Sequence, residues 1–96
     1  MLKLLLSPRA VIDLEEIFEY TLETWNISQA EKYQDELFES MQSLLINNNL
    51  GTLYYHKEGN YRKLNANRHL IFYRITDQHC IVIRILHERM DLRKQL

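Results

Sequence analysis

The sequence predicts an α+β fold in which an N-terminal strand and an antiparallel helical hairpin are followed by an antiparallel sheet, in the order β-α-α-β-β-β. Two observations support this prediction. Apolar residues recur every three or four positions between residues 8 and 46, as on one side of a helix, and they alternate between residues 61 and 86, as in strands. A chain of 96 residues is long enough for one hydrophobic core, so we expect residues 1–96 to form a single domain.

A short strand and a capped helix are expected first. Alternation in residues 2–6 predicts a strand whose even-numbered positions face inward. Serine is a favoured N-cap and proline suits the first helical position, so Ser7-Pro8 predicts the start of a helix that ends near Thr24. The side of this helix that we expect to be buried consists of Val11, Leu14, Ile17, Phe18 and Leu22.

A second helix is expected after a short link. The segment Ser28-Gln29-Ala30-Glu31 has the pattern of a capping box, which predicts a helix start at Ser28. We expect Trp25 to be wedged at the bend of the hairpin, and residues 47–49 to end the second helix. The buried stripe of this helix is predicted to consist of Ala30, Tyr33, Leu37, Met41 and Leu44.

Strands are expected in the second half of the chain. Residues 51–60 fit either a short strand or an ordered loop, whereas residues 61–66 and 69–76 alternate and predict two strands joined by a turn. Residues 80–86 predict a final strand that is apolar on both sides and therefore lies inside the sheet. Its two sides are expected to consist of Ile81, Ile83 and Ile85 on one and Val82, Arg84 and Leu86 on the other.

Charge is divided unevenly between the two halves. Residues 1–46 contain nine acidic and three basic residues, whereas residues 47–96 contain four acidic and nine basic ones. We therefore expect a basic, sheet-rich side that can meet an acidic partner or nucleic acid. Pairing between the acidic helices and the basic sheet would account for part of this charge.

Several classes of protein are disfavoured. No apolar run approaches the roughly 20 residues that cross a bilayer, and residues 1–6 are too short for a secretory signal, so we expect no membrane contact and a cytoplasmic location. The single cysteine, Cys80, fits a small core residue. Because the chain lacks a glycine-rich phosphate loop, a helical His-x-x-x-His and a cysteine pair, it predicts no cofactor and no metal site.

A group of polar residues follows the final strand. Arg84 interrupts one apolar side, and His87, Glu88, Arg89 and Asp91 come directly after it. In one interpretation Arg84 pairs with a carboxylate and the others form a solvated strand end. In the other, a buried strand rigidly presents a chemical or binding surface.

Three stretches of the chain resemble the ParE/RelE superfamily of type II toxins. I-L-H-E-R-M-D-L (residues 85–92) is similar to the C-terminal signature of ParE toxins, and R-H-L-I-F-Y-R-I (residues 68–75) resembles their penultimate strand. L-S-P-R-A-V-I-D-L-E-E-I (residues 6–17) resembles their first helix. The resemblance extends from residue 6 to the end of the chain, is weakest between residues 47 and 60, and implies a RelE/ParE-like fold.

This resemblance implies the toxin of a type II toxin–antitoxin module, which binds DNA gyrase and traps the cleaved-DNA complex without catalytic residues of its own. It also implies a cognate ParD-type antitoxin that neutralises the toxin within a hetero-oligomer. The hypothesised target-binding residues are Arg84, His87, Arg89, Met90, Asp91, Leu92 and Arg93. Those hypothesised to bind the antitoxin's carboxylates are Arg62, Arg68, Arg74 and Arg84.

The alternative is a RelE-like endoribonuclease that cuts messenger RNA on the ribosome. A histidine such as His87 among arginines would suit general acid–base cleavage of a phosphodiester. The RelE-like branch typically has a catalytic Tyr or His after the last strand and an Arg on the penultimate strand. Here Met90-Asp91 follow His87-Glu88-Arg89, and no tyrosine occurs after Tyr73. Leu70 stands where the arginine is expected, with Arg68 two residues earlier. The ribonuclease set is therefore incomplete.

Overall fold

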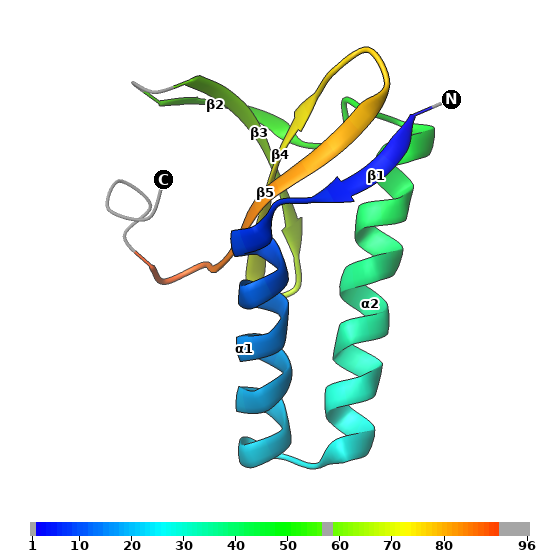
Figure 1. Cartoon of the computed structure of the whole chain (residues 1–96). Helices are drawn as coiled ribbons and strands as arrows, with labels where there is room; N and C mark the ends of the chain where they lie inside the picture. The colour runs from blue at the N-terminus through cyan, green and yellow to red at the C-terminus, as the bar shows by residue number, and fades with distance from the viewer. Residues whose placement is uncertain (1, 57–58, 91–96) are drawn as a thin grey trace.

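A five-stranded sheet with two helices packed on one side makes up the fold (Figure 1). The computed structural model describes residues 2–56 and 59–90. The elements are β1 (Lys3–Leu6), α1 (Pro8–Thr24), α2 (Ile27–Ile46), β2 (Thr52–His56), β3 (Gly59–Ala66), β4 (His69–Ile75) and β5 (His79–His87). Neither described helix is long and apolar enough to cross a membrane.

The strand order of the sheet is β1-β5-β4-β3-β2. Strands β2 to β5 are antiparallel to their neighbours, whereas β1 runs parallel to β5, with Leu4 opposite Cys80. The predicted α+β fold class is confirmed, but the sheet is mixed and has one strand more than expected. The additional strand is β2, from the stretch for which the sequence left strand and loop open.

Helix α1 begins and ends where the sequence predicts. Ser7 is its N-cap, and the Ser7 hydroxyl oxygen accepts a hydrogen bond of 3.0 Å from the amide of Ala10. The predicted start of α2 is wrong, because Asn26 is the N-cap and accepts a bond of 2.8 Å from the amide of Gln29. Asparagine caps a helix as well as serine does, so α2 gains a residue before Ser28.

The buried sides of the two helices differ in how well they were predicted. The stripe of α2 is confirmed, because Tyr33 is half-buried and the other four residues are buried. On α1, Leu14 is buried as predicted, but Val11 and Leu22 are exposed. This helix turns a different side to the sheet, formed by Ala10, Asp13 and Leu14. Trp25 is 70% exposed, so its predicted wedging at the bend is wrong.

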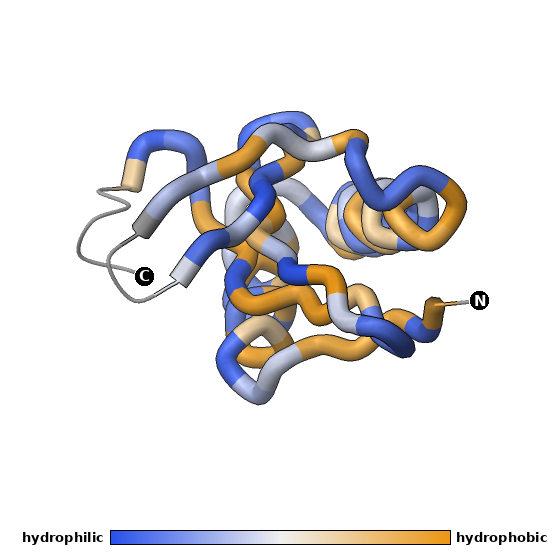
Figure 2. Tube along the Cα trace, turned by 90° about the horizontal axis from the view of Figure 1, so that it is seen from above, coloured by the Kyte–Doolittle hydropathy of each residue, from blue (hydrophilic) through white to orange (hydrophobic). Residues whose placement is uncertain are grey.

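Hydrophobic residues are buried on both sides of the sheet. The helix side holds the main cluster, in which Leu37 and Met41 of α2 meet Ile71 and Val82 of the sheet. The opposite side of β4 and β5 holds a smaller cluster of Leu70, Phe72 and Leu86, which packs against Tyr54. Figure 2 views the helices end-on and shows hydrophobic stretches running through the sheet, with hydrophilic stretches at the turns.

Strand β5 contains a bulge that reverses its alternation. Phe72 pairs with Arg84, but the next residue of β4, Tyr73, pairs with Val82, so Ile83 is an extra residue. As a result Val82 and Ile85 both belong to the helix-side cluster. The predicted division of residues 81–86 into two sides is therefore wrong beyond Val82, since a one-residue insertion exchanges the sides of all later residues.

Candidate binding groove at the end of strand β5

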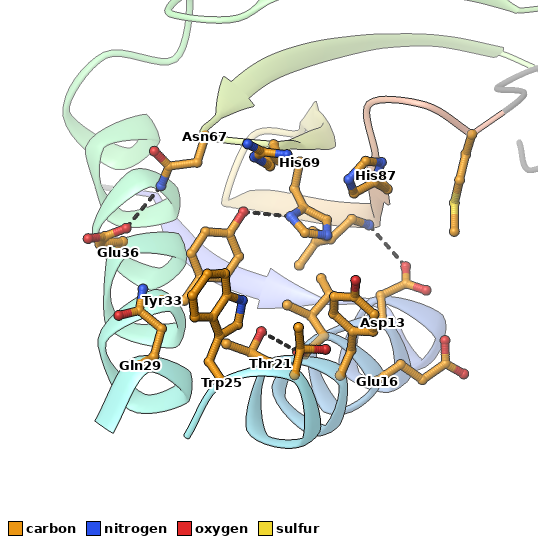
Figure 3. Close-up of a pocket in the computed structure, with 16 residues that line it drawn as sticks. Asp13, Glu16, Thr21, Trp25, Gln29, Tyr33, Glu36, Asn67, His69 and His87 are labelled. Atoms are coloured by element: carbon orange, nitrogen blue, oxygen red, sulfur yellow. Dashed lines mark hydrogen bonds between the residues drawn. The ribbon is translucent and has the colours of Figure 1, made fainter. Parts of the chain in front are cut away.

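A groove of about 820 Å³ lies between the helical hairpin and the adjoining ends of β4 and β5 (Figure 3). Helix α1 and the hairpin link provide Tyr20 and Trp25, which are 68% and 70% exposed. Helix α2 provides Tyr33, and the two strand ends provide His69 and His87. Large exposed aromatic side chains around a groove are typical of a surface that binds another molecule.

Two histidines and a tyrosine form a contact chain in this groove. The Tyr33 hydroxyl and Nδ1 of His69 share a hydrogen bond of 2.6 Å. The His69 ring meets the His87 ring edge to face, with 5.3 Å between centroids, and Nδ1 of His87 accepts a bond of 3.1 Å from the amide of Arg89. In Figure 3 the His69 imidazole lies between Tyr33 and His87. These contacts connect α2 to the residues that follow β5.

Burial sets the protonation states of His69 and Tyr33. Burial, with added repulsion from His87, lowers the pKa of His69 from 6.5 to about 4. Burial also raises the pKa of the Tyr33 hydroxyl above its usual value of 10. At neutral pH the groove therefore holds a neutral His69 and a protonated Tyr33, which can bind through hydrogen bonds but carry no charge.

One of the residues that line the groove is a buried carboxylate. Asp13 of α1 is 4% exposed and accepts hydrogen bonds from Nε and Nη2 of Arg84, at 2.8 and 3.1 Å, and from the amide of Ile85 at 3.0 Å. Arg9 adds a longer contact of 3.6 Å. Of the two interpretations of Arg84, pairing with a carboxylate is the one observed. The Arg84 side chain is only 12% exposed, so it links β5 to α1 inside the protein and does not form part of the exposed surface.

The other predicted target-binding residues lie at or beyond the end of β5. His87 is half-buried and, with the exposed Met90, lines the groove. Arg89 is also exposed, in the turn that follows the strand. Asp91, Leu92 and Arg93 lie outside the described residues. The structure thus brings His87 and Met90 together at one edge of the groove.

The structure does not gather the four predicted antitoxin-binding arginines into one cluster. Arg68 is exposed and lines the groove. Arg62 donates a hydrogen bond of 2.8 Å to the carbonyl of Gly51, and the guanidinium of Arg74 lies 4.8 Å from the centre of the Tyr61 ring. Of the four, Arg68 is the one that is both exposed and placed in the groove.

Most groove residues were not identified as functional from the sequence, among them Asp13, Trp25, Tyr33 and His69. Tyr33 and Trp25 were assigned to packing, and His69 to a strand start. Asp13 gave a signal that could have been used, because it is an acidic residue next to Leu14 on the apolar side of a helix. A buried carboxylate requires a cationic or hydrogen-bonding partner.

The chemistry of the groove suits a peptide better than a metal ion or a phosphate. No cluster of potential metal ligands occurs within residues 2–56 and 59–90. The carboxylates of Glu16 and Glu36 line the groove together with Arg68, and Glu36 accepts a bond of 3.0 Å from the side-chain amide of Asn67. Aromatic rings with charges of both signs fit an amphipathic peptide segment.

Comparisons with known proteins match nearly the whole length of this chain. A family model described as ParE toxin of type II toxin–antitoxin system, parDE, matches residues 4–92. Toxin ParE1 of Mycobacterium tuberculosis is 41% identical over 93 residues, which cover 96% of this chain and 95% of that protein. Toxin ParE1 of Caulobacter vibrioides is 31% identical over 91 residues, which cover 95% and 94%. A solved structure titled "Chromosomal ParDE TA system from P. aeruginosa" shares the fold with a TM-score of 0.78, at 19% identity, covering 91% of this chain and 96% of that one.

Proposed function

The chain belongs to the ParE toxin family of type II toxin–antitoxin systems, and from this membership we propose that it inhibits DNA gyrase in the cytoplasm by trapping the cleaved-DNA complex. The proposal rests on family membership together with one structural observation. Strand β5 lies between β1 and β4, and it presents His87, Arg89 and Met90 at the end of a well-supported strand. A rigid surface of this kind suits inhibition by binding, because little conformational freedom is lost on association.

The target surface in this proposal consists of His87, Arg89 and Met90, with the neighbouring Arg68 adding positive charge. Arg89 and Arg68 are exposed and could meet phosphates or carboxylates, whereas Met90 offers an adaptable apolar contact. Arg84 contributes indirectly, since its guanidinium is bound to Asp13.

Gyrase assays with purified protein test this proposal. The unaltered chain should inhibit supercoiling and accumulate broken plasmid, and Arg89→Ala should weaken both effects at least tenfold. Lys32→Ala is the matched control, because it removes an exposed positive charge from α2 and should change neither effect. Removal of residues 89–96 should abolish toxicity and leave the sheet folded by circular dichroism, since β5 ends at His87. A truncated chain that stays toxic would show that the surface is assigned wrongly.

We further propose that an acidic, amphipathic segment of a ParD-type antitoxin occupies the groove. Its apolar side would cover the exposed rings of Tyr20 and Trp25, and its carboxylates would meet Arg68. Because His87 and Met90 also line the groove, the bound segment would cover part of the target surface. Neutralisation would then follow from competition for the same residues, and the segment would fold as it docks.

The chain's single tryptophan gives a direct test of antitoxin binding. Trp25 fluorescence should shift to shorter wavelength when a tryptophan-free antitoxin segment covers the ring. Trp25→Ala should raise the dissociation constant about 30-fold, because losing an interface anchor costs on the order of 2 kcal/mol. Tyr55→Ala is the control, since Tyr55 is equally exposed, at 70%, but lies on β2 outside the groove. Equal effects of the two variants would exclude the groove as the docking site.

A ribosome-dependent endoribonuclease is the second candidate, because the groove places Arg68 in a common lining with His69 and His87. Glu16 and Glu36 in the same lining disfavour it, since carboxylates repel a phosphodiester. Expression in a bacterial host separates the two functions. Gyrase inhibition should produce filamented cells and a DNA-damage response with intact transcripts, whereas the enzyme should cleave transcripts on translating ribosomes.

A further inference from the structure

We propose that Ser7 and Asp13 are positioning residues, which hold the bulge at Ile83 and so determine which side chains at the end of β5 enter the groove. The two residues belong to the N-terminal part of the chain and lie about 70 positions before the bulge in sequence. Ser7 binds the carbonyl of the extra residue itself, and Asp13 binds the backbone amide two residues later. The functional part of this inference rests on the gyrase proposal, and the structural part does not.

The hydrogen bonds around the bulge replace a missing strand. Strand β1 pairs with β5 only as far as Leu6 opposite Val82. Immediately beyond that pair, the hydroxyl of Ser7 donates a bond of 2.6 Å to the carbonyl of Ile83. Asp13 then accepts a bond of 3.0 Å from the amide of Ile85. The side chains of the N-cap Ser7 and of Asp13 in α1 thus satisfy backbone groups of β5 that would otherwise bond to a neighbouring strand.

The bulge places His87 in the groove. Successive residues of a strand point to opposite sides, so Arg84 and Leu86 would share the side of Val82 if the strand were regular. His87 would then point away from the helices. With Ile83 as the extra residue, Ile85 and His87 take the helix side instead, and His87 pairs with His69. One inserted residue therefore decides whether the groove contains an imidazole.

Asp13 also binds the side chain that the bulge turns away from the groove. Arg84 pairs with Phe72, and its guanidinium reaches the Asp13 carboxylate through two hydrogen bonds. The same carboxylate thus holds the Arg84 side chain and the Ile85 amide in one arrangement. In the alternative register neither bond can form with the same geometry, so Asp13 favours the observed one.

Nuclear magnetic resonance of purified Asp13→Asn tests the structural part directly. We expect loss of the ring contact between His69 and His87 and faster hydrogen exchange at the Ile85 amide. Deletion of Ile83 should rescue the ring contact in the Asp13→Asn background. The deletion keeps Tyr73 opposite Val82 and Phe72 opposite Arg84. Because β5 then has no extra residue, this register no longer requires the hydrogen bonds of Ser7 and Asp13. A residue that only stabilised the fold would not be rescued by shortening a strand.

Leu37→Ala is the matched control, because it removes core packing beside Val82 and Ile85 but leaves the hydrogen bonds of Ser7 and Asp13 in place, and it should preserve the ring contact. Ser7→Gly is a milder second variant, since glycine still serves as a helix cap but lacks the hydroxyl that binds Ile83. It should weaken the ring contact even if Asp13→Asn fails to fold. An unchanged ring contact in both variants, or no rescue by the deletion, would overturn the inference.

Gyrase inhibition is measured in parallel with the same proteins. Asp13→Asn should lose at least tenfold in inhibition and recover most of it when Ile83 is also deleted. If the unaltered chain leaves gyrase untouched while the ring contact is lost and rescued as expected, the gyrase proposal fails and the positioning role stands. If Asp13→Asn and Leu37→Ala lose inhibition only in proportion to their loss of stability, the positioning role is refuted.

Discussion

Acidification should destabilise the protein through His69. Its pKa is about 4 in the folded state and about 6.5 when the side chain is exposed to water, so between these values the unfolded state binds a proton that the folded state does not. The stability from His69 is therefore complete above pH 6.5 and is lost as the pH falls through about 4. Each unit of pKa difference corresponds to about 1.36 kcal/mol, so a difference of about 2.5 units gives at most about 3–4 kcal/mol. Because the ring is only partly shielded from solvent, we expect about 2 kcal/mol.

Urea unfolding at a series of pH values from 7.5 to about 3.5 measures this loss. The unaltered protein should lose about 2 kcal/mol more than His69→Gln over this range, because glutamine does not titrate and can still bond to the Tyr33 hydroxyl. His79→Gln is the control, since His79 lies at the other end of β5 and outside the groove. Parallel pH curves for the unaltered protein and His69→Gln would refute the argument that burial keeps His69 neutral.

Three further predictions concern the free energy of unfolding, measured with urea at pH 7. Gly51→Ala should cost about 1–3 kcal/mol, because the added methyl carbon would lie 2.7 Å from a backbone carbonyl and a buried ring; an unchanged midpoint would contradict this close packing. Arg84→Met should cost about 3 kcal/mol by leaving the buried Asp13 carboxylate without its guanidinium, and a neutral effect would mean that the pair is dispensable. Leu37→Ala should cost about 2–5 kcal/mol, because its side chain is fully buried. Trp25→Ala should cost less than about 1 kcal/mol, because that side chain is 70% exposed. Comparable losses in the two variants would show that Trp25 packs in the core.

Local signals predicted most of the fold. Ser7-Pro8 fixed the start of α1, and the stripe from Ala30 to Leu44 identified the buried side of α2, because both depend on residues close in sequence. The side of α1 was harder to predict. Hydropathy favours Val11 and Leu22 over Asp13, yet Asp13 is buried because Arg84, 71 positions away, neutralises it. Only the folded arrangement brings such a partner to the helix.

The site was predicted less completely than the fold. The polar end of β5 indicated the region where the groove lies, and Arg68 and His87 line this groove. The bulge at Ile83 could not be anticipated, because a bulge in an apolar strand leaves no mark on hydropathy and depends on which backbone groups find partners elsewhere. For the same reason the pairing of His69 with His87 could not be predicted from their separate positions in the sequence.

The adjacency of β1 and β5 has a consequence for the synthesis of this toxin. A nascent polypeptide that has not yet reached residue 79 leaves β1 with no neighbour in the sheet, and before residue 84 is added Asp13 lacks the guanidinium of Arg84. Products that lack β5 therefore cannot complete the five-stranded sheet, and we expect them to be harmless to the host that makes them. The cell meets a folded toxin only once translation of the closing strand is finished, which gives an inhibitor already present the chance to capture each molecule at its release.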